Sequence, residues 1–149
     1  MSDVVNPKYA VLAEKIGLFR GLSPSDVQKI FSKGMTVRVQ KGETIFLKGT
    51  TGNKMYVVLG GNVGVFDGPK CIAKLGVGET FGEMSLLNDE PRTATIVALA
   101  PVNLFVLSED VFLKLLTKKV AVRILMNIAR SMSTKVKNTN LLVREMEGR

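Results

Sequence analysis

The stretch KGETIFLKGTTGNKMYVVLGGNVGVF, residues 41–66, contains three short apolar runs that are separated by glycines. The runs TIFL, MYVVL and VGVF are rich in the β-branched and aromatic residues that favour strands. Glycine is typical of tight turns, where the backbone needs a positive φ, and of sharp bends between strands. The stretch therefore predicts consecutive short strands and no helix.

The same pattern extends on both sides of this stretch. The runs TVRV, CIAKL, TATIVA and NLFVL lie between Thr36 and Leu107, again with glycine or proline in the connections. Seven or eight short strands at this spacing indicate an antiparallel sandwich or barrel. We therefore expect a β-domain over residues 35–107.

Helical signals precede the β-domain, in residues 1–34. Ser23 and Pro24 place a capping residue before a proline at the first position of a helix. Asn6 and Pro7 repeat the arrangement near the N-terminus. We expect an N-terminal helical segment.

Residues 108–149 also predict helices. Ser108 is a typical cap, and neither proline nor glycine interrupts residues 120–146. Apolar positions there follow a heptad with one polar member: Val122, Leu125, Ala129, Met132, Val136, Thr139, Val143 and Met146. This pattern fits a helix that pairs with a second copy in a homodimer, or a helix that packs on its own β-domain.

The net charge of +8 is concentrated near the C-terminus. Residues 1–112 carry 12 basic and 11 acidic side chains, whereas residues 113–149 carry 9 and 2. A nucleic-acid-binding role, the alternative function, would have to rest on this basic segment. The segment has no aromatic residue to stack on bases and its basic residues are scattered, so a solvated helix face is the simpler interpretation.

The residue types that are missing exclude several classes of enzyme. The chain has no histidine, and Cys71 is its single cysteine, so we expect no metal site. Cupin-like barrel enzymes depend on histidine-rich metal clusters, and we expect no catalytic residues here. No apolar run is long enough to cross a bilayer, and the N-terminus lacks a signal pattern. We expect a cytoplasmic protein.

The segment FGEMSLLNDEPRTAT, residues 81–95, contains the candidate site. Glu83 and Arg92 lie nine positions apart among small and apolar residues. Either they form a surface salt bridge with each other, or they face a ligand that carries both a hydroxyl and a negative charge. Gly82 would let the backbone approach such a ligand, and the free N–H groups of a short helical turn would attract an anion.

Each charged side chain suits one part of that ligand. Arg92 can hold phosphate oxygens through two parallel hydrogen bonds. Glu83 would repel phosphate but can accept a hydrogen bond from a neighbouring sugar hydroxyl. Thr93 adds a hydroxyl donor. A ribose ring closed by a phosphodiester satisfies all of these groups.

This segment resembles the phosphate-binding cassette of the cyclic nucleotide-binding domain family, which includes catabolite activator protein and the regulatory subunit of protein kinase A. The family pattern is close to F-G-E, a hydrophobic residue, a small residue and L, followed by P-R-[A/T]-A. LFRGLS and IAKLGVGETFGE match the family framework as well, and the resemblance covers about residues 17–116. It implies an antiparallel double-stranded β-helix, or jelly-roll barrel, with N-terminal helices and a long C-terminal helix.

The resemblance also implies roles for individual residues. Glu83 would bind the ribose 2′-hydroxyl, and Arg92 would bind the exocyclic phosphate oxygens. Backbone N–H groups would supply the other sugar-phosphate contacts: Gly82, Met84, Ser85 and Thr93. Aliphatic side chains would line the base pocket: Val65 and Leu75. Ser85 stands where many members have alanine, at a position that contributes mainly its amide.

The implied ligand is cyclic AMP, with cyclic GMP as the alternative. Thr93 is compatible with cyclic GMP as the ligand, because a threonine at this position can hydrogen-bond the guanine amino group. The resemblance implies a non-catalytic sensor without a cofactor, which signals through its C-terminal helix to an unknown effector protein. Leu141 or Leu142 would close over the base. We expect either a stand-alone module or a fragment of a larger protein.

Overall fold

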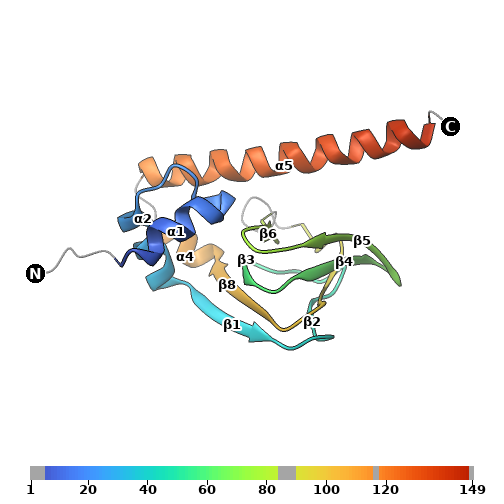
Figure 1. The fold of residues 1–149 in the computed structure, drawn as a ribbon, viewed down its shortest axis with the longest axis horizontal. Coiled ribbons are helices and arrows are strands. Elements are labelled where there is room, and N and C mark those ends of the chain that lie inside the picture. The colour runs from blue at the N-terminus through green and yellow to red at the C-terminus, as the bar shows by residue number, and fades with distance from the viewer. Residues whose placement is uncertain (1–5, 84–89, 116–117, 148–149) are drawn as a thin grey trace, which may run out of the picture.

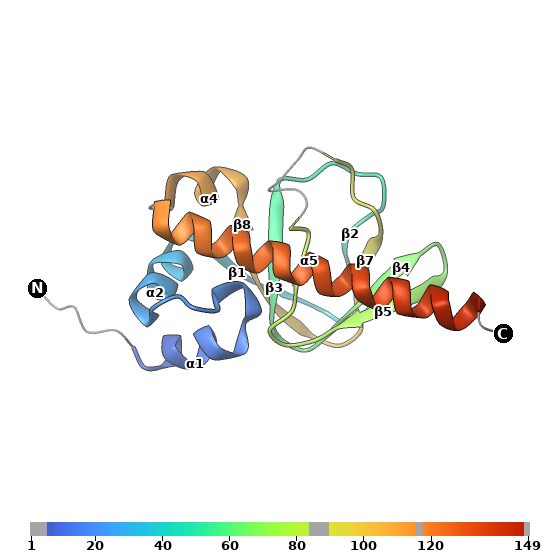
Figure 2. The same cartoon turned by 90° about the horizontal axis from the view of Figure 1, so that it is seen from above.

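The computed structural model describes residues 6–83, 90–115 and 118–147. Short helices gather at one end of the molecule and β-strands at the other, and the long helix α5 (Lys118–Glu147) runs along both (Figures 1 and 2). The fold is mostly β with flanking helices, as the sequence predicted. In the part of the chain that the structure describes, no helix combines the length and the apolar character that a membrane span requires.

The described strands form two four-stranded antiparallel sheets. The first sheet has the order β1 (Met35–Val39), β8 (Val102–Ser108), β3 (Lys54–Gly60), β6 (Thr80–Phe81). The second has the order β2 (Thr44–Phe46), β7 (Thr95–Ala98), β4 (Val63–Asp67), β5 (Lys70–Leu75). The prediction of a jelly-roll barrel needs correction in one respect: these strands pair only within their own sheet, so the jelly roll is a two-sheet sandwich and not a closed barrel.

Strand β8 is buried on both faces, which explains the continuous apolar run NLFVL. In β8, Leu104 and Val106 belong to the core between the two sheets. Phe105 and Leu107 point to the opposite face and belong to a second core, which the helices cover. Because successive side chains of a strand alternate between faces, a strand that is covered on both sides needs apolar residues at every position.

The short helices begin where the sequence predicted capping residues. The Asp26 backbone N–H donates to Ser23 Oγ (3.2 Å) at the start of α2 (Pro24–Lys33). The Val111 N–H donates to Ser108 Oγ (3.3 Å) at the start of α4 (Glu109–Leu115). These two predicted caps are confirmed. The predicted cap at Asn6 is shifted by one residue, because Pro7 is the N-cap of the first helix, although the Lys8 N–H does donate to Asn6 Oδ1 (3.0 Å). The other helical elements are α1 (Lys8–Lys15) and the 3₁₀ turn η1 (Gly17–Phe19).

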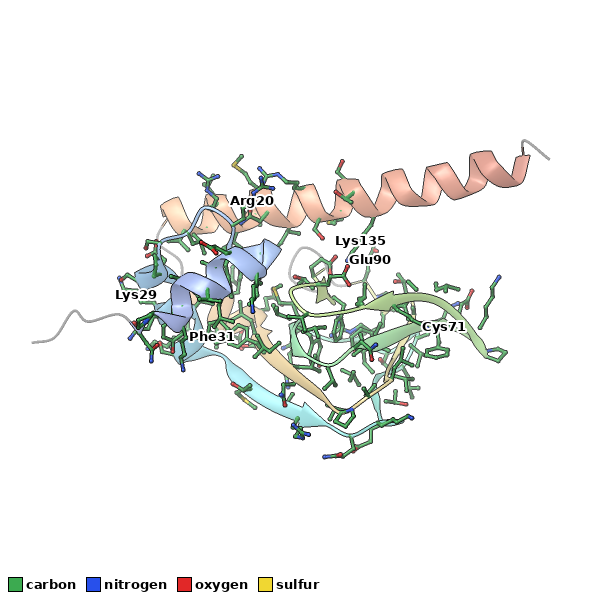
Figure 3. All side chains as sticks on the ribbon, viewed as in Figure 1. Arg20, Lys29, Phe31, Cys71, Glu90 and Lys135 are labelled. Atoms are coloured by element: carbon green, nitrogen blue, oxygen red, sulfur yellow. The ribbon has the colours of Figure 1, made fainter. Side chains whose placement is uncertain are left out.

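An aromatic cluster joins these helices to the first sheet. Phe105 of β8 lies with its ring centroid 4.4 Å from that of Phe31 in α2 and 6.4 Å from that of Phe19 in η1. Figure 3 shows Phe31 at the junction between the helices and the strands. Aromatic pairs at these separations add stabilisation beyond the burial of their area, so this cluster fixes the helices against β8.

Helix α5 is anchored to the same helical core through its first half. Ile124 and Ile128 are buried in that core. Asn127 is also buried, and its Nδ2 donates to the backbone oxygens of Leu18 (2.7 Å) and Arg20 (2.9 Å). These contacts tie α5 to η1, since a buried amide that loses such partners destabilises the fold.

The face of α5 that packs on the protein coincides only in part with the predicted heptad face. Val122 and Leu125, the first two heptad positions, are exposed, as is the neighbouring Met126. Met132, a later heptad position, is partly buried and packs on the helical core with Ile124 and Ile128. The described half of α5 therefore packs on its own domain and leaves an apolar stripe open near its start. A homodimer through this stripe stays a prediction, which light scattering of the full chain and of a truncation near residue 120 would test.

We expect Gly78→Ala to destabilise the fold by about 2 kcal/mol or more. Gly78 has φ +88°, and an added Cβ would lie 2.2 Å from the backbone oxygen of Lys15. Gly76→Ala is the matched control, because φ is not positive there and no atom lies within 4 Å of an added Cβ. Urea denaturation of both variants measures the difference, and equal midpoints would contradict the prediction.

Candidate functional site

The structure brings Gly82, Glu83 and Arg92 together at the start and end of the predicted cassette. Glu83 and Arg92 are both buried, although charged side chains seldom are unless they have partners. A surface salt bridge, one of the two interpretations of this pair, is therefore wrong. Residues 84–89 lie outside the described residues, and with them Met84 and Ser85.

The backbone of Arg92 is fixed to the turn that precedes β3. The Arg92 N–H donates to the Thr50 oxygen (2.8 Å), and the Gly49 N–H donates to the Arg92 oxygen (2.8 Å). These two bonds hold the C-terminal end of the cassette against residues about 40 positions earlier in the chain. The side chain of Arg92 is thereby directed inward from a defined backbone position.

The guanidinium of Arg92 is held by the first sheet and by one aromatic ring. Nη2 donates to the Lys54 oxygen (2.9 Å) and Nη1 donates to the Gly82 oxygen (3.3 Å). Its Cζ lies 4.1 Å from the centroid of the Phe46 ring, which is cation–π geometry. A planar guanidinium carries five N–H donors in a fork whose geometry matches carboxylate and phosphate oxygens.

Two glycines make room for this guanidinium. An added Cβ at Gly52 would lie 2.5 Å from Arg92 Nη2. At Gly82 it would lie 2.8 Å from Arg92 Nη1, and the φ of +76° there favours glycine as well. The sequence predicted that Gly82 lets the backbone approach a ligand. In the structure, the missing Cβ of Gly82 leaves space for the Arg92 guanidinium. The similar role of Gly52 was not predicted.

Burial and neighbouring charges shape the electrostatics of the site. Burial lowers the pKa of Arg92, while the negative charges of the Tyr56 phenolate and of Glu83 oppose that change. Burial likewise raises the pKa of Tyr56, and the positive charge of Arg92 opposes this. The cation is therefore partly desolvated, so it would attract a phosphate more strongly than it would in water.

The carboxylate of Glu83 is engaged by helix α5. Lys135 Nζ lies 2.5 Å from Glu83 Oε1 and 3.2 Å from the backbone oxygen of Thr80. In Figure 3, Lys135 points from α5 toward the β-domain. Sequence reasoning missed this residue as part of the site, because 52 positions separate the two side chains and no local pattern links them.

The structure also describes three other predicted contact residues. Val65 in β4 and Leu75 in β5 are partly buried and pack on the core between the sheets. The side chain of Thr93 is exposed. A cavity of about 220 Å³ is lined by residues of β1, β2, β3 and β8, and a cavity of about 340 Å³ lies between α1 and β3. Glu83 and Arg92 line neither of these two cavities.

The fold and the site define a jelly-roll sandwich with a buried arginine and a buried glutamate at the two ends of one cassette. A family model described as "Cyclic nucleotide-binding domain" matches residues 36–119, more than half of the chain. The chain belongs to the cyclic nucleotide-binding domain family.

Individual relatives agree with this family. A cGMP-dependent protein kinase of Eimeria tenella is 35% identical over 145 residues, 97% of this chain and 14% of the kinase. A cAMP-dependent protein kinase regulatory subunit of Hypocrea atroviridis is 30% identical over 108 residues, 72% of this chain and 23% of that protein. The chain thus spans less than a quarter of these relatives' length.

Among solved structures, catabolite activator protein of Thermus thermophilus is similar with a TM-score of 0.76. It is 29% identical, and the match covers 88% of this chain and 63% of that one. The arrangement of sheets and helices is therefore shared with a known member of the predicted group.

Proposed function

We propose that this chain is a regulatory module that binds a cyclic mononucleotide, cyclic AMP or, as the alternative, cyclic GMP. The observation that carries the proposal is the buried guanidinium of Arg92 within the cassette, next to the glycine that precedes Glu83. Arg92 is permanently charged and matches the exocyclic phosphate oxygens. Glu83 is an acceptor for the ribose 2′-hydroxyl.

The remaining contacts complete this assignment. Backbone N–H groups of the cassette would bind the sugar-phosphate: Gly82, Met84, Ser85 and Thr93. The apolar surface of the second sheet, with the partly buried Val65 and Leu75, would receive the base. The exposed hydroxyl of Thr93 is compatible with the guanine amino group, so both bases stay in the proposal. The names of the relatives include both a cGMP-dependent and a cAMP-dependent protein.

We further infer that the module is non-catalytic and passes its signal to an effector protein through α5. The chain's relatives include kinases of which it spans 14% of the length, which supports a regulatory part and not a catalytic one. The effector itself, a cytoplasmic location and the absence of a cofactor stay predictions.

A thermal-shift panel tests the proposed function. Cyclic AMP, cyclic GMP, a cyclic dinucleotide and linear AMP are compared at equal concentrations. We expect a rise in Tm with a cyclic mononucleotide only, because a ligand present at 100 times its Kd stabilises the folded state by about 2.7 kcal/mol. The larger of the two cyclic mononucleotide shifts assigns the base. No shift with any nucleotide, together with salt-dependent retention on DNA, would instead favour the basic-helix alternative.

A further inference from the structure

Helix α1 turns one face toward a cavity that lies apart from the cassette. The cavity has a volume of about 340 Å³ and is lined by residues of α1, of strand β3 and of the turn before β6. This volume is within the usual range for small-molecule sites, whereas a stable protein interface needs a much larger surface. A small ligand is therefore the occupant that suits its size.

Four of the lining residues form one stripe on α1: Lys8, Val11, Leu12 and Lys15. Their i, i+3, i+4, i+7 spacing places them on the same face of a helix. The two middle residues are apolar and the two outer ones are lysines, and seven residues of an α-helix span about 10 Å. A lysine thus stands at each end of an apolar strip.

The other walls of the cavity are fixed to each other and to α1. The Val58 N–H of β3 donates to the Glu79 oxygen (2.9 Å), and the Gly78 N–H donates to the Val58 oxygen (2.8 Å). These bonds hold the turn that carries Val77 against β3. The same turn approaches α1 at Gly78, where an added Cβ would meet the Lys15 oxygen. The cavity is therefore preformed.

The lining offers apolar contact and positive charge. Val11 is 48% exposed and Val77 is 54% exposed, although both face this cavity, so a ligand would remove apolar surface from water. No lining residue is acidic, and none has a hydroxyl or amide side chain. Within the described residues, neither Lys8 nor Lys15 forms an ion pair. The complement of this lining is an apolar molecule with a negative charge.

We propose that this cavity binds a small amphipathic carboxylate, an apolar chain with one anionic head group, as in a medium-chain fatty acid. The chain lies on Val11, Leu12 and Val58, and the carboxylate meets an ammonium at the rim. The inference is independent of the proposed cyclic nucleotide function, because no lining residue belongs to the cassette.

The test uses octanoate as the probe and 1-octanol as an uncharged molecule of the same chain length. Amide chemical shifts of the ¹⁵N-labelled full chain locate the binding site and give Kd. We expect octanoate to shift residues 8–16, 57–59 and 76–78, and to bind about fivefold more tightly than 1-octanol, because an exposed ion pair contributes a factor of this order. Added salt should weaken the binding of octanoate only.

A pair of double variants tests the lysines. Lys8→Met with Lys15→Met removes both ammonium groups and keeps the length of the side chains. Lys29→Met with Lys33→Met is the matched control, since both of these lysines are exposed on α2 and do not line the cavity. We expect octanoate to bind about fivefold more weakly to the first variant and unchanged to the control. 1-Octanol should bind wild type and both variants equally.

Three outcomes would overturn the proposal. The first is the absence of shifts at the cavity, or shifts spread over the other exposed apolar residues. The second is equal affinity of wild type for octanoate and for 1-octanol. The third is equal affinity of the two double variants for octanoate. All four lysines are exposed, so neither variant should lose its fold, and the dispersion of the amide spectrum checks this.

Discussion

Arg92→Ala is expected to weaken cyclic nucleotide binding by about 2–5 kcal/mol, which is at least thirtyfold in Kd. The guanidinium is buried, and its loss would leave a desolvated phosphate without a charged partner. Calorimetric titration of wild type and variant with cyclic AMP and cyclic GMP measures the loss directly. Binding within threefold of wild type would contradict the assignment of Arg92 to the phosphate.

The folding of this variant needs its own control, because Arg92 also supports the structure. Its guanidinium satisfies the carbonyl oxygens of Lys54 and Gly82, which alanine would leave without this donor. Arg92→Lys keeps the positive charge but not the two-pronged geometry, so we expect an intermediate loss of affinity. Arg38→Ala, at an exposed arginine of β1, should bind as wild type does. Melting curves of all three variants separate lost binding from lost folding.

Phe105→Ala is expected to have the largest effect on stability, about 3–5 kcal/mol. The ring is fully buried and contacts both Phe31 and Phe19, so its removal leaves a cavity where the helices meet β8. The free energy of unfolding of wild type and variant, measured in urea, gives the loss. The loss is severe, because the whole free energy of unfolding of a typical domain is about 5–15 kcal/mol.

Leu113→Ala is the matched control for the loss of a large apolar side chain. Leu113 is 69% exposed on α4, so its truncation should change the stability by less than about 0.5 kcal/mol. If Phe105→Ala and Leu113→Ala had the same urea midpoint, the second core would not contribute as described. Phe105→Leu, which refills part of the cavity, should lie between wild type and alanine.

The elements and the cassette could be predicted because their signals are local. Ser23 and Ser108 cap helices through N–H groups three residues ahead, so both caps were visible in the sequence. The short apolar runs between glycines predicted the positions of the strands in the same way. Gly82 and Glu83 are adjacent, and Arg92 follows in the same segment, so one contiguous motif indicated the site.

The partition of strands into sheets was not predictable in this way. The sequence indicated an antiparallel sandwich or barrel, and the resemblance favoured a barrel. The sequence of a strand does not show whether it pairs with β7 or with β8. Pairing depends on the path of the whole chain, which brings distant strands together. The register shifts in β2, β3 and β4 are likewise set by the partner strands.

The sequence by itself determined the class of fold, the starts of the helices capped by Ser23 and Ser108, and the presence of Arg92 and Glu83 in a single cassette. Only the tertiary structure decided which groups satisfy those charges: the backbone oxygen of Lys54 for Arg92 and the ammonium of Lys135 for Glu83. Tertiary contacts also decided which face of α5 is buried. The reason is that a buried charge must find partners wherever the folded chain brings them, and residues tens of positions apart share no local pattern.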